Sequence, residues 1–246
     1  MCGVYFSFMN NRTKIVSWAL YDAANTIFAT NVVSLYFPLW VTVQKGASDN
    51  WYILAYYFSI VLAVFILPFF GILSDKLRKY SFFLRIFTLV CITFTASIGL
   101  FDNLLAGVVF FVVANLFNQV AANTFYPALL AEVSPADKIP FVSGLGVGLG
   151  YIGTIVGLSF ARLFVKEANY QNVFLPTASL FLLFSLPCFL FVKDARKEMK
   201  MRDSISIIRE HLRNFLAAFR TLITNRMLLK FFCSILLMIN GVNGVL

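Results

Sequence analysis

The stretch FVSGLGVGLGYIGTIVGLSFARLFV, residues 141–165, decides how the rest of the sequence is interpreted. Its centre, GLGYIG (148–153), matches the G-x-G-x-x-G pattern of dinucleotide-binding proteins, which requires a strand before the glycines and a helix after them. Here the glycines lie inside one apolar run, and about 20 such residues span a bilayer as a helix. We therefore interpret the stretch as a membrane span and exclude NAD binding. In lipid, glycines let two helix backbones approach closely, and we assign this packing role to Gly144, Gly148, Gly150, Gly153 and Gly157.

The composition of the whole chain supports a lipid environment. Of 246 residues, 60% are hydrophobic and 13% are charged, against about 25% charged residues in a soluble domain. Backbone amides in lipid must be paired within their own segment, so spans of this length are helices. The fold class predicted is all-α, a polytopic membrane helix bundle, with spans at 15–43, 51–74, 80–101, 104–131, 141–165, 173–192 and 227–246.

The positive charges gather on one side of this predicted bundle. The N-terminus, the even-numbered turns and residues 193–230 hold all Lys and Arg except Lys45, Arg162 and Lys166. Because cytoplasmic loops are enriched in Lys and Arg, the N-terminus is expected in the cytoplasm. This distribution accounts for the net charge of +9 without a nucleic-acid partner. The chain is expected to divide into a six-helix bundle (1–192), a cytoplasmic linker (193–226) and a seventh span (227–246).

The linker contains an amphipathic pattern over about 203–222. Apolar residues recur there at spacings of three and four, with Arg209, Arg213 and Arg220 off the apolar face. Two interpretations stay open: a helix lying on the cytoplasmic membrane surface, or a soluble connector helix.

Neither a cofactor nor a catalytic set is expected. The four cysteines are scattered and there is a single histidine, His211. No Cys or His spacing typical of a metal site or a disulfide framework occurs. We predict no metal, no cofactor and no enzymatic activity.

Two predicted spans carry polar residues at helical spacing. The first has Asp22, Asn25 and Thr26, followed by Thr30. The fourth has Asn115, Gln119 and Asn123, with Asn118 and Tyr126 alongside. Polar groups in a membrane usually face the bundle interior or a water-filled cavity. These stripes predict a shared pathway for substrate or protons, or, alternatively, interhelical hydrogen bonds that only hold the bundle together.

The turn after the second span, GILSDKLRK (71–79), resembles a signature of the major facilitator superfamily, G-x-L-x-D-[RK]-x-G-[RK]. Gly71, Asp75, Lys76 and Lys79 match, whereas Arg78 stands where glycine is expected. The resemblance implies a conformational role for this loop, and twelve spans in two halves that rock around a central solute.

Further motifs resemble one branch of that superfamily, the vacuolar amino-acid effluxers associated with autophagy. They are WALYDAAN (18–25), FYPALL (125–130), SGLG (143–146) and GYIG (150–153). Asn240 stands where that branch usually has an acid. The resemblance implies a secondary transporter that exports a small polar organic solute, such as an amino acid, by alternating access. It also implies that this chain is the N-terminal six-helix half of a major facilitator fold, with 227–246 opening the second half.

The expected partners follow from this incomplete fold. They are membrane lipids, a small-molecule solute, and either a separate second half or a second copy of the chain. Alone, as a fragment, the chain is expected not to transport. A competing hypothesis is a non-transporting membrane module that binds lipid or a partner protein through its basic cytoplasmic loop. A cell membrane, plasma or bacterial inner, is expected in preference to a vacuolar membrane.

Overall fold

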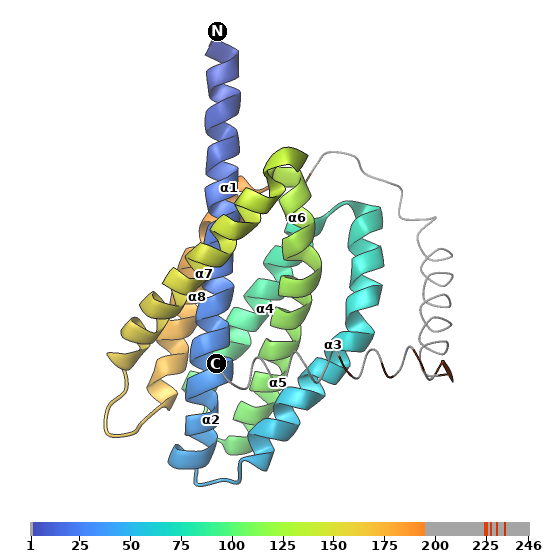
Figure 1. Cartoon of the computed structure of the whole chain (residues 1–246). Coiled ribbons are helices and arrows are strands. Elements are labelled where there is room, and N and C mark those ends of the chain that lie inside the picture. Colours follow the sequence, from blue (N-terminus) through green and yellow to red (C-terminus); the bar gives the residue numbers. More distant parts are fainter. Residues whose placement is uncertain (1, 195–223, 226, 228–229, 231–233, 235–246) are drawn as a thin grey trace. The chain divides into compact units, whose positions relative to one another are not determined.

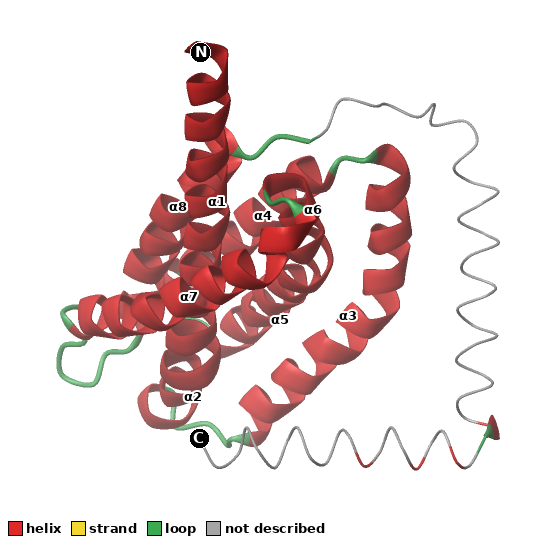
Figure 2. Ribbon diagram, turned by 45° about the horizontal axis from the view of Figure 1, so that its top comes forward, coloured by secondary structure: helices red, strands yellow, loops and turns green. Residues whose placement is uncertain are grey.

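The chain forms a bundle of long helices. The computed structural model describes residues 2–194 and the isolated positions 224, 225, 227, 230 and 234. Within these described residues every regular element is helical, as Figures 1 and 2 show. Six segments are long and apolar enough to cross a membrane: Arg12–Gln44, Asn50–Leu77, Tyr80–Leu100, Leu104–Val133, Ala136–Arg162 and Gln171–Phe191.

These segments confirm the predicted fold class, and each lies within a few residues of one of the first six predicted spans. The seventh span and the amphipathic linker helix lie outside the described residues.

Several spans are built from more than one helical element. The first contains α1 (Cys2–Phe28), the π-helical η1 (Ala29–Tyr36), α2 (Phe37–Leu39) and the π-helical η2 (Trp40–Gln44). The second is α3 (Asn50–Leu77) and the third is α4 (Tyr80–Leu100). The fourth contains α5 (Leu104–Val120), the π-helical η3 (Ala121–Phe125) and α6 (Tyr126–Val133). The fifth is η4 (Ala136–Lys138) with α7 (Ile139–Arg162), and the sixth is η5 (Gln171–Val173) with α8 (Phe174–Phe191).

The helices pack as two groups of three. In one group α1 packs along both α7 and α8, and in the other α5 packs along both α3 and α4. The contact between α4 and α8 joins the groups. The consecutive pairs α3 and α4, and α7 and α8, have few mutual contacts, and Figure 1 shows α3 on the opposite side of the bundle from α7. The two spans with polar stripes, the first and the fourth, are therefore the central helices of the two groups.

Side-chain contacts show which turns between the spans lie at the same end of the bundle. At one end the Gln44 side-chain oxygen accepts the backbone N–H groups of Tyr170 and Gln171, at 2.7 and 3.0 Å. At the same end, Lys45 forms an ion pair with Asp102. At the other end the Asp194 carboxylate accepts the N–H groups of the first turn of α4, from Ser81 at 2.6 Å and Phe82 at 3.2 Å. The strict alternation of turns predicted from the sequence is therefore present.

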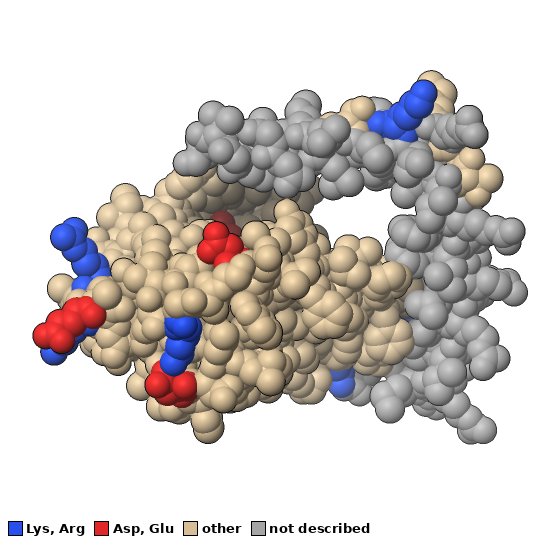
Figure 3. Space-filling view, turned by 90° about the horizontal axis from the view of Figure 1, so that it is seen from below, with Lys and Arg blue, Asp and Glu red and all other residues tan. Residues whose placement is uncertain are grey.

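The outer surface is apolar, as expected of a protein dissolved in lipid. Large hydrophobic side chains are exposed along α3, α7 and α8, among them Leu54 (69%), Tyr151 (70%) and Leu183 (60%). Figure 3 looks from below onto one end of the bundle, where the Lys, Arg, Asp and Glu side chains lie among uncharged residues. In water such contiguous exposure would mark an interaction surface, whereas acyl chains can cover it in a membrane.

Candidate functional site

The polar face of α1 lies against α7. Asp22, Asn25 and Thr26 are half-buried. A Cβ atom placed on Gly150 would lie 3.4 Å from Asp22 Oδ2 and 3.0 Å from Thr26 Oγ1. Gly150 is close to the middle of α7 (Ile139–Arg162), so the Asp22 carboxylate is also level with the middle of that span. The first predicted stripe therefore meets a neighbouring helix near the middle of α7.

A row of glycines on α7 makes this close approach possible. The row is formed by Gly146, Gly150, Gly153 and Gly157, which are buried against α1. At Gly153 an added Cβ would lie only 2.7 Å from the carbonyl oxygen of Ala23. Of the five glycines assigned to packing, Gly150, Gly153 and Gly157 lie in this row. Gly144 and Gly148 have nothing within 4 Å of an added Cβ.

The side chains on the polar face differ in their hydrogen bonding. The Thr26 hydroxyl donates to the backbone oxygen of Asp22 at 2.8 Å, and the Thr30 hydroxyl donates to that of Thr26 at 2.8 Å. The carboxylate of Asp22 forms no hydrogen bond or ion pair within the described part of the chain, and the buried Oδ1 of Asn25 also lacks a hydrogen-bond partner there. Three acceptor groups are therefore available on neighbouring turns of one helix.

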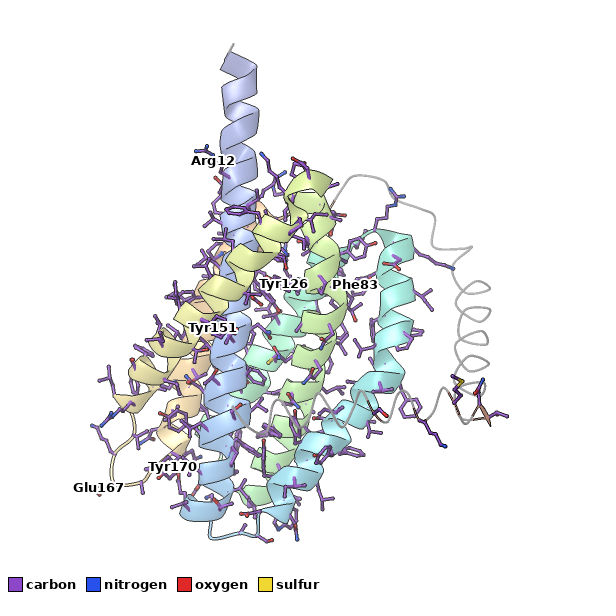
Figure 4. All side chains as sticks on the ribbon, viewed as in Figure 1. Arg12, Phe83, Tyr126, Tyr151, Glu167 and Tyr170 are labelled. Carbon is purple, nitrogen blue, oxygen red and sulfur yellow. The ribbon has the colours of Figure 1, made fainter. Side chains whose placement is uncertain are left out.

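An aromatic stack lies one turn along the glycine row. The rings of Trp18 and Tyr126 are stacked with centroids 4.4 Å apart, and Trp18 Nε1 donates to the backbone oxygen of Tyr126 at 3.0 Å. The Tyr126 hydroxyl is buried without a hydrogen-bond partner in the described structure, and it lies 3.2 Å from the Cβ position of Gly146. Figure 4 shows Tyr126 among the helices of the bundle. The stack joins the fourth span to the first beside the polar face of α1.

The second predicted stripe divides into separate parts. Asn115 is fully buried and donates to the Ser59 hydroxyl at 2.7 Å, which joins the fourth span to the second. Asn123 is exposed and donates to the backbone and side-chain oxygens of Gln119, at 2.8 and 3.0 Å. No hydrogen bond among the described residues joins these three side chains to the Asp22 carboxylate. Asn115 thus has the geometry of an interhelical hydrogen bond, whereas Gln119 and Asn123 are bonded to each other within one helix.

The signature turn keeps its tight geometry without the expected glycine. α3 extends through Asp75 and Lys76 to Leu77, so the chain reverses later than the predicted turn at 75–79. Arg78, at the glycine position, ends the helix with φ 48° and ψ 42°, the left-handed region. The hydroxyl of Tyr80 donates to Asp75 Oδ1 at 3.0 Å.

The remaining signature residues lie close to this turn. The ammonium group of Lys76 is buried without a hydrogen bond among the described residues. A Cβ on Gly71 would contact the Thr124 methyl at 3.7 Å, so this glycine lies at the contact between α3 and η3. Lys79 also takes part in the interactions of this end.

Two interhelical contacts were not predicted from the sequence. Asn31 is fully buried and donates to the Gly157 carbonyl at 3.0 Å and to Thr177 Oγ1 at 3.3 Å. The π-helical register from Ala29 onward shifts side chains relative to an α-helical count from Asp22. At the C-terminal end of α8, Arg85 and Ser81 donate to the carbonyl of Val192, at 3.1 and 2.7 Å. The only feature of the sequence that pointed to the second contact was Arg85 itself, a lone basic residue near the end of a predicted span.

Other site types find no support in the described residues. These contain no group of three or more His, Cys, Asp or Glu side chains that could hold a metal. A cavity of about 340 Å³ lies at the start of α8 and contains none of the predicted site residues. It is lined by Gly99, Phe164, Lys166, Gln171, Asn172, Leu175 and Pro176.

Comparison with known proteins places the bundle in a family. The model of the Major Facilitator Superfamily matches residues 23–246. An uncharacterized protein of Aquifex aeolicus (strain VF5) is 29% identical over 188 residues, which are 76% of this chain and 48% of that protein. The uncharacterized MFS-type transporter YxiO of Bacillus subtilis (strain 168) is 29% identical over 174 residues, 66% of this chain and 40% of that protein. The chain thus spans half or less of the length of these curated relatives.

The family match covers most of the chain, and the six described spans and all-helical architecture agree with it. The family groups membrane transporters and not enzymes, which confirms the expectation that the chain is not an enzyme. The chain is therefore a multi-pass membrane protein that belongs to the Major Facilitator Superfamily.

Proposed function

We propose that the chain forms one six-helix half of a secondary transporter that moves a small polar organic solute by alternating access. The observation that carries this proposal is the set of Asp22, Asn25 and Thr26 on α1, where Asp22 and Thr26 meet the middle of α7, with acceptor oxygens that no described group satisfies. Polar groups in hydrocarbon are costly, and they mark solute or ion pathways when they lack structural partners. Gln119 and Asn123 extend the pathway toward the cytoplasmic end of the fourth span.

The finer features of the function come from the sequence motifs. We propose export of amino acids, because the motifs at 18–25, 125–130 and 150–153 resemble the vacuolar effluxer branch. The charge distribution supports a cytoplasmic N-terminus, and a cell membrane is preferred to a vacuolar one. The signature turn around Asp75, Lys76 and Lys79 is proposed to stabilise one of the two conformations.

The second side of the pathway is proposed to come from another six-helix unit. Solute in this superfamily fold binds between two halves near the midplane, and this chain matches less than half the length of its relatives. A separate second half or a second copy of this chain would supply the missing wall.

Counterflow of radiolabelled amino acids in proteoliposomes tests the proposal. The chain is reconstituted alone and together with the part of the Aquifex relative that it does not cover. We expect no flux from the chain alone and saturable flux from the pair, which Asp22→Asn abolishes. Glu167→Gln, a charge-neutralising change in the exposed turn before α8, is the matched control and should retain flux. Absence of flux from the pair would contradict the proposal.

The alternative is a non-transporting module that binds through the basic linker at 193–226, for which the excess of arginines is the supporting observation. Replacing Arg209, Arg213 and Arg220 by glutamine separates the two functions. A module would lose its lipid or protein partner, whereas a transporter would keep its flux.

A further inference from the structure

Three polar groups approach one short part of the glycine row. Asp22 and Thr26 approach the Cβ position of Gly150, and the Tyr126 hydroxyl approaches that of Gly146. The unsatisfied Oδ1 of Asn25 lies within one turn of Asp22 and Thr26 on the same helix, and we name these four groups the Asp22 cluster. Residues four apart on a helix lie about 6 Å apart along its axis, so a small molecule could contact several of these groups at once.

The free hydrogen-bonding capacity of the cluster is mainly that of acceptors. A carboxylate only accepts, and an amide oxygen only accepts. Thr26 has already donated its proton to the backbone oxygen of Asp22, at 2.8 Å, so its remaining capacity is to accept. The donors that remain in the cluster are the Tyr126 hydroxyl and the Nδ2 amide group of Asn25. A ligand for this cluster must consequently bring N–H or O–H donors.

The charge of the cluster is negative and uncompensated. No ion pair joins a basic side chain to Asp22 among the described residues, and the guanidinium of Arg85 donates to Ser81 and Val192 at the end of the bundle. The α7 residues that face Asp22 are glycines, which carry no side-chain charge. An intramembrane carboxylate normally pairs with a positive partner, and none is supplied by the described part of this chain.

We propose that the Asp22 cluster binds the ammonium group of the transported solute, an inference that rests on the proposed transport function and names the chemistry it recognises. A primary ammonium carries one positive charge and three N–H donors, which match Asp22, Asn25 and Thr26. The site therefore selects amines and amino acids over carboxylic acids and neutral polyols of equal size.

Three probes of nearly equal size test this selection: alanine, alaninamide and lactate. Alaninamide keeps the ammonium and lacks the carboxylate, whereas lactate keeps the carboxylate and has a hydroxyl in place of the ammonium. Binding is measured by calorimetry on the full chain in nanodiscs. Alanine and alaninamide should bind at least tenfold more tightly than lactate. Equal or tighter binding of lactate, or binding of none of the three probes, would overturn the inference.

Variants of Asp22 then test whether the preference for ammonium-bearing probes depends on the Asp22 cluster. Asp22→Asn should weaken alaninamide binding by about 10- to 100-fold, the loss expected for one charged hydrogen-bonded contact. Asp22→Glu keeps the charge and should keep most of the affinity, and the helical circular dichroism of both variants reports their folding. Glu167→Gln is the control and should bind like the parent. Unchanged alaninamide affinity in a folded Asp22→Asn variant would overturn the inference.

The test separates this inference from the proposed function. Saturable flux of a solute without an ammonium group would contradict ammonium recognition and leave transport established. Ammonium binding without flux from the reconstituted pair would support the site and contradict transport.

Discussion

Arg78 occupies a backbone conformation that suits glycine. Its φ of 48° lies in the left-handed region, which costs an L-residue with a side chain about 1–2 kcal/mol. The sequence comparison identified this position as a departure from the signature, and the structure shows that the turn keeps its geometry at that cost. The match of Gly71, Asp75, Lys76 and Lys79 was visible in the sequence, whereas the backbone angle was not.

We expect Arg78→Gly to raise the free energy of unfolding by about 0.5–1 kcal/mol, because strain relief exceeds the extra entropy of glycine in the unfolded chain. Equilibrium unfolding in mixed micelles measures this change. Arg78→Ala is the matched control, since it removes the charge and keeps the strain. A glycine variant that is no more stable than the alanine variant would contradict the explanation.

The glycines of α7 differ in what surrounds them, although they look alike in the sequence. Gly153→Ala places a methyl group 2.7–3.0 Å from backbone and Cβ atoms of Ala23, and we expect a loss of about 1–3 kcal/mol from overpacking. Gly148→Ala meets open space and should gain about 0.5–1 kcal/mol from helix propensity. Thermal unfolding of both variants in detergent measures the contrast. Equal effects would mean that the row does not set the contact between α1 and α7.

At the scale of elements, the positions of the spans were predictable from the sequence, whereas the π-helical stretches inside them were not. A span needs about 20 apolar residues, so hydropathy alone located six spans to within a few residues. The π-helical stretches η1 and η3 were not foreseen, although each ends two residues before a proline, Pro38 and Pro127. A proline lacks the N–H that continues an α-helical ladder. Asn31 follows Asp22 by nine residues, about half a turn away from the Asp22 face of the helix, so the stripe count did not include it.

The contact between η2 and α5 depends on a residue without a side chain. A Cβ on Gly107 would lie 2.3 and 2.7 Å from ring atoms of the fully buried Trp40. Gly107→Ala should therefore destabilise the bundle by about 1–3 kcal/mol. Unfolding in mixed micelles measures the loss of stability. Adding Trp40→Phe to the Gly107→Ala variant should recover part of that stability, because a phenyl ring is shorter than an indole ring. A double variant whose losses simply add would show that the two residues do not interact.

For the whole molecule, the alternation of turns followed from the sequence, while the neighbour relations did not. Lipid solvates every apolar face equally well, so hydropathy carries no information on which helices touch. The glycines of α7 indicated a close partner without naming it, and the structure identifies that partner as α1. Of the residues in the polar stripes, Asn115 is buried, Asp22 is half-buried and Asn123 is exposed. The sequence could not separate the interhelical bond of Asn115 from the unsatisfied groups around Asp22.

Water access to Asp22 is the measurement that tests the account most directly. Single cysteines replace Asp22 and Leu183 in a background without the native cysteines, and a charged thiol reagent is applied to the chain in membranes. Only a thiolate in contact with water reacts. Leu183 is 60% exposed and Asp22 is half-buried, so exposure of the protein surface alone predicts faster labelling at Leu183. We predict labelling at Asp22 and protection at Leu183, because an aqueous pathway reaches the first position and lipid covers the second. Rapid labelling at Leu183, or an unreactive cysteine at Asp22, would contradict the account.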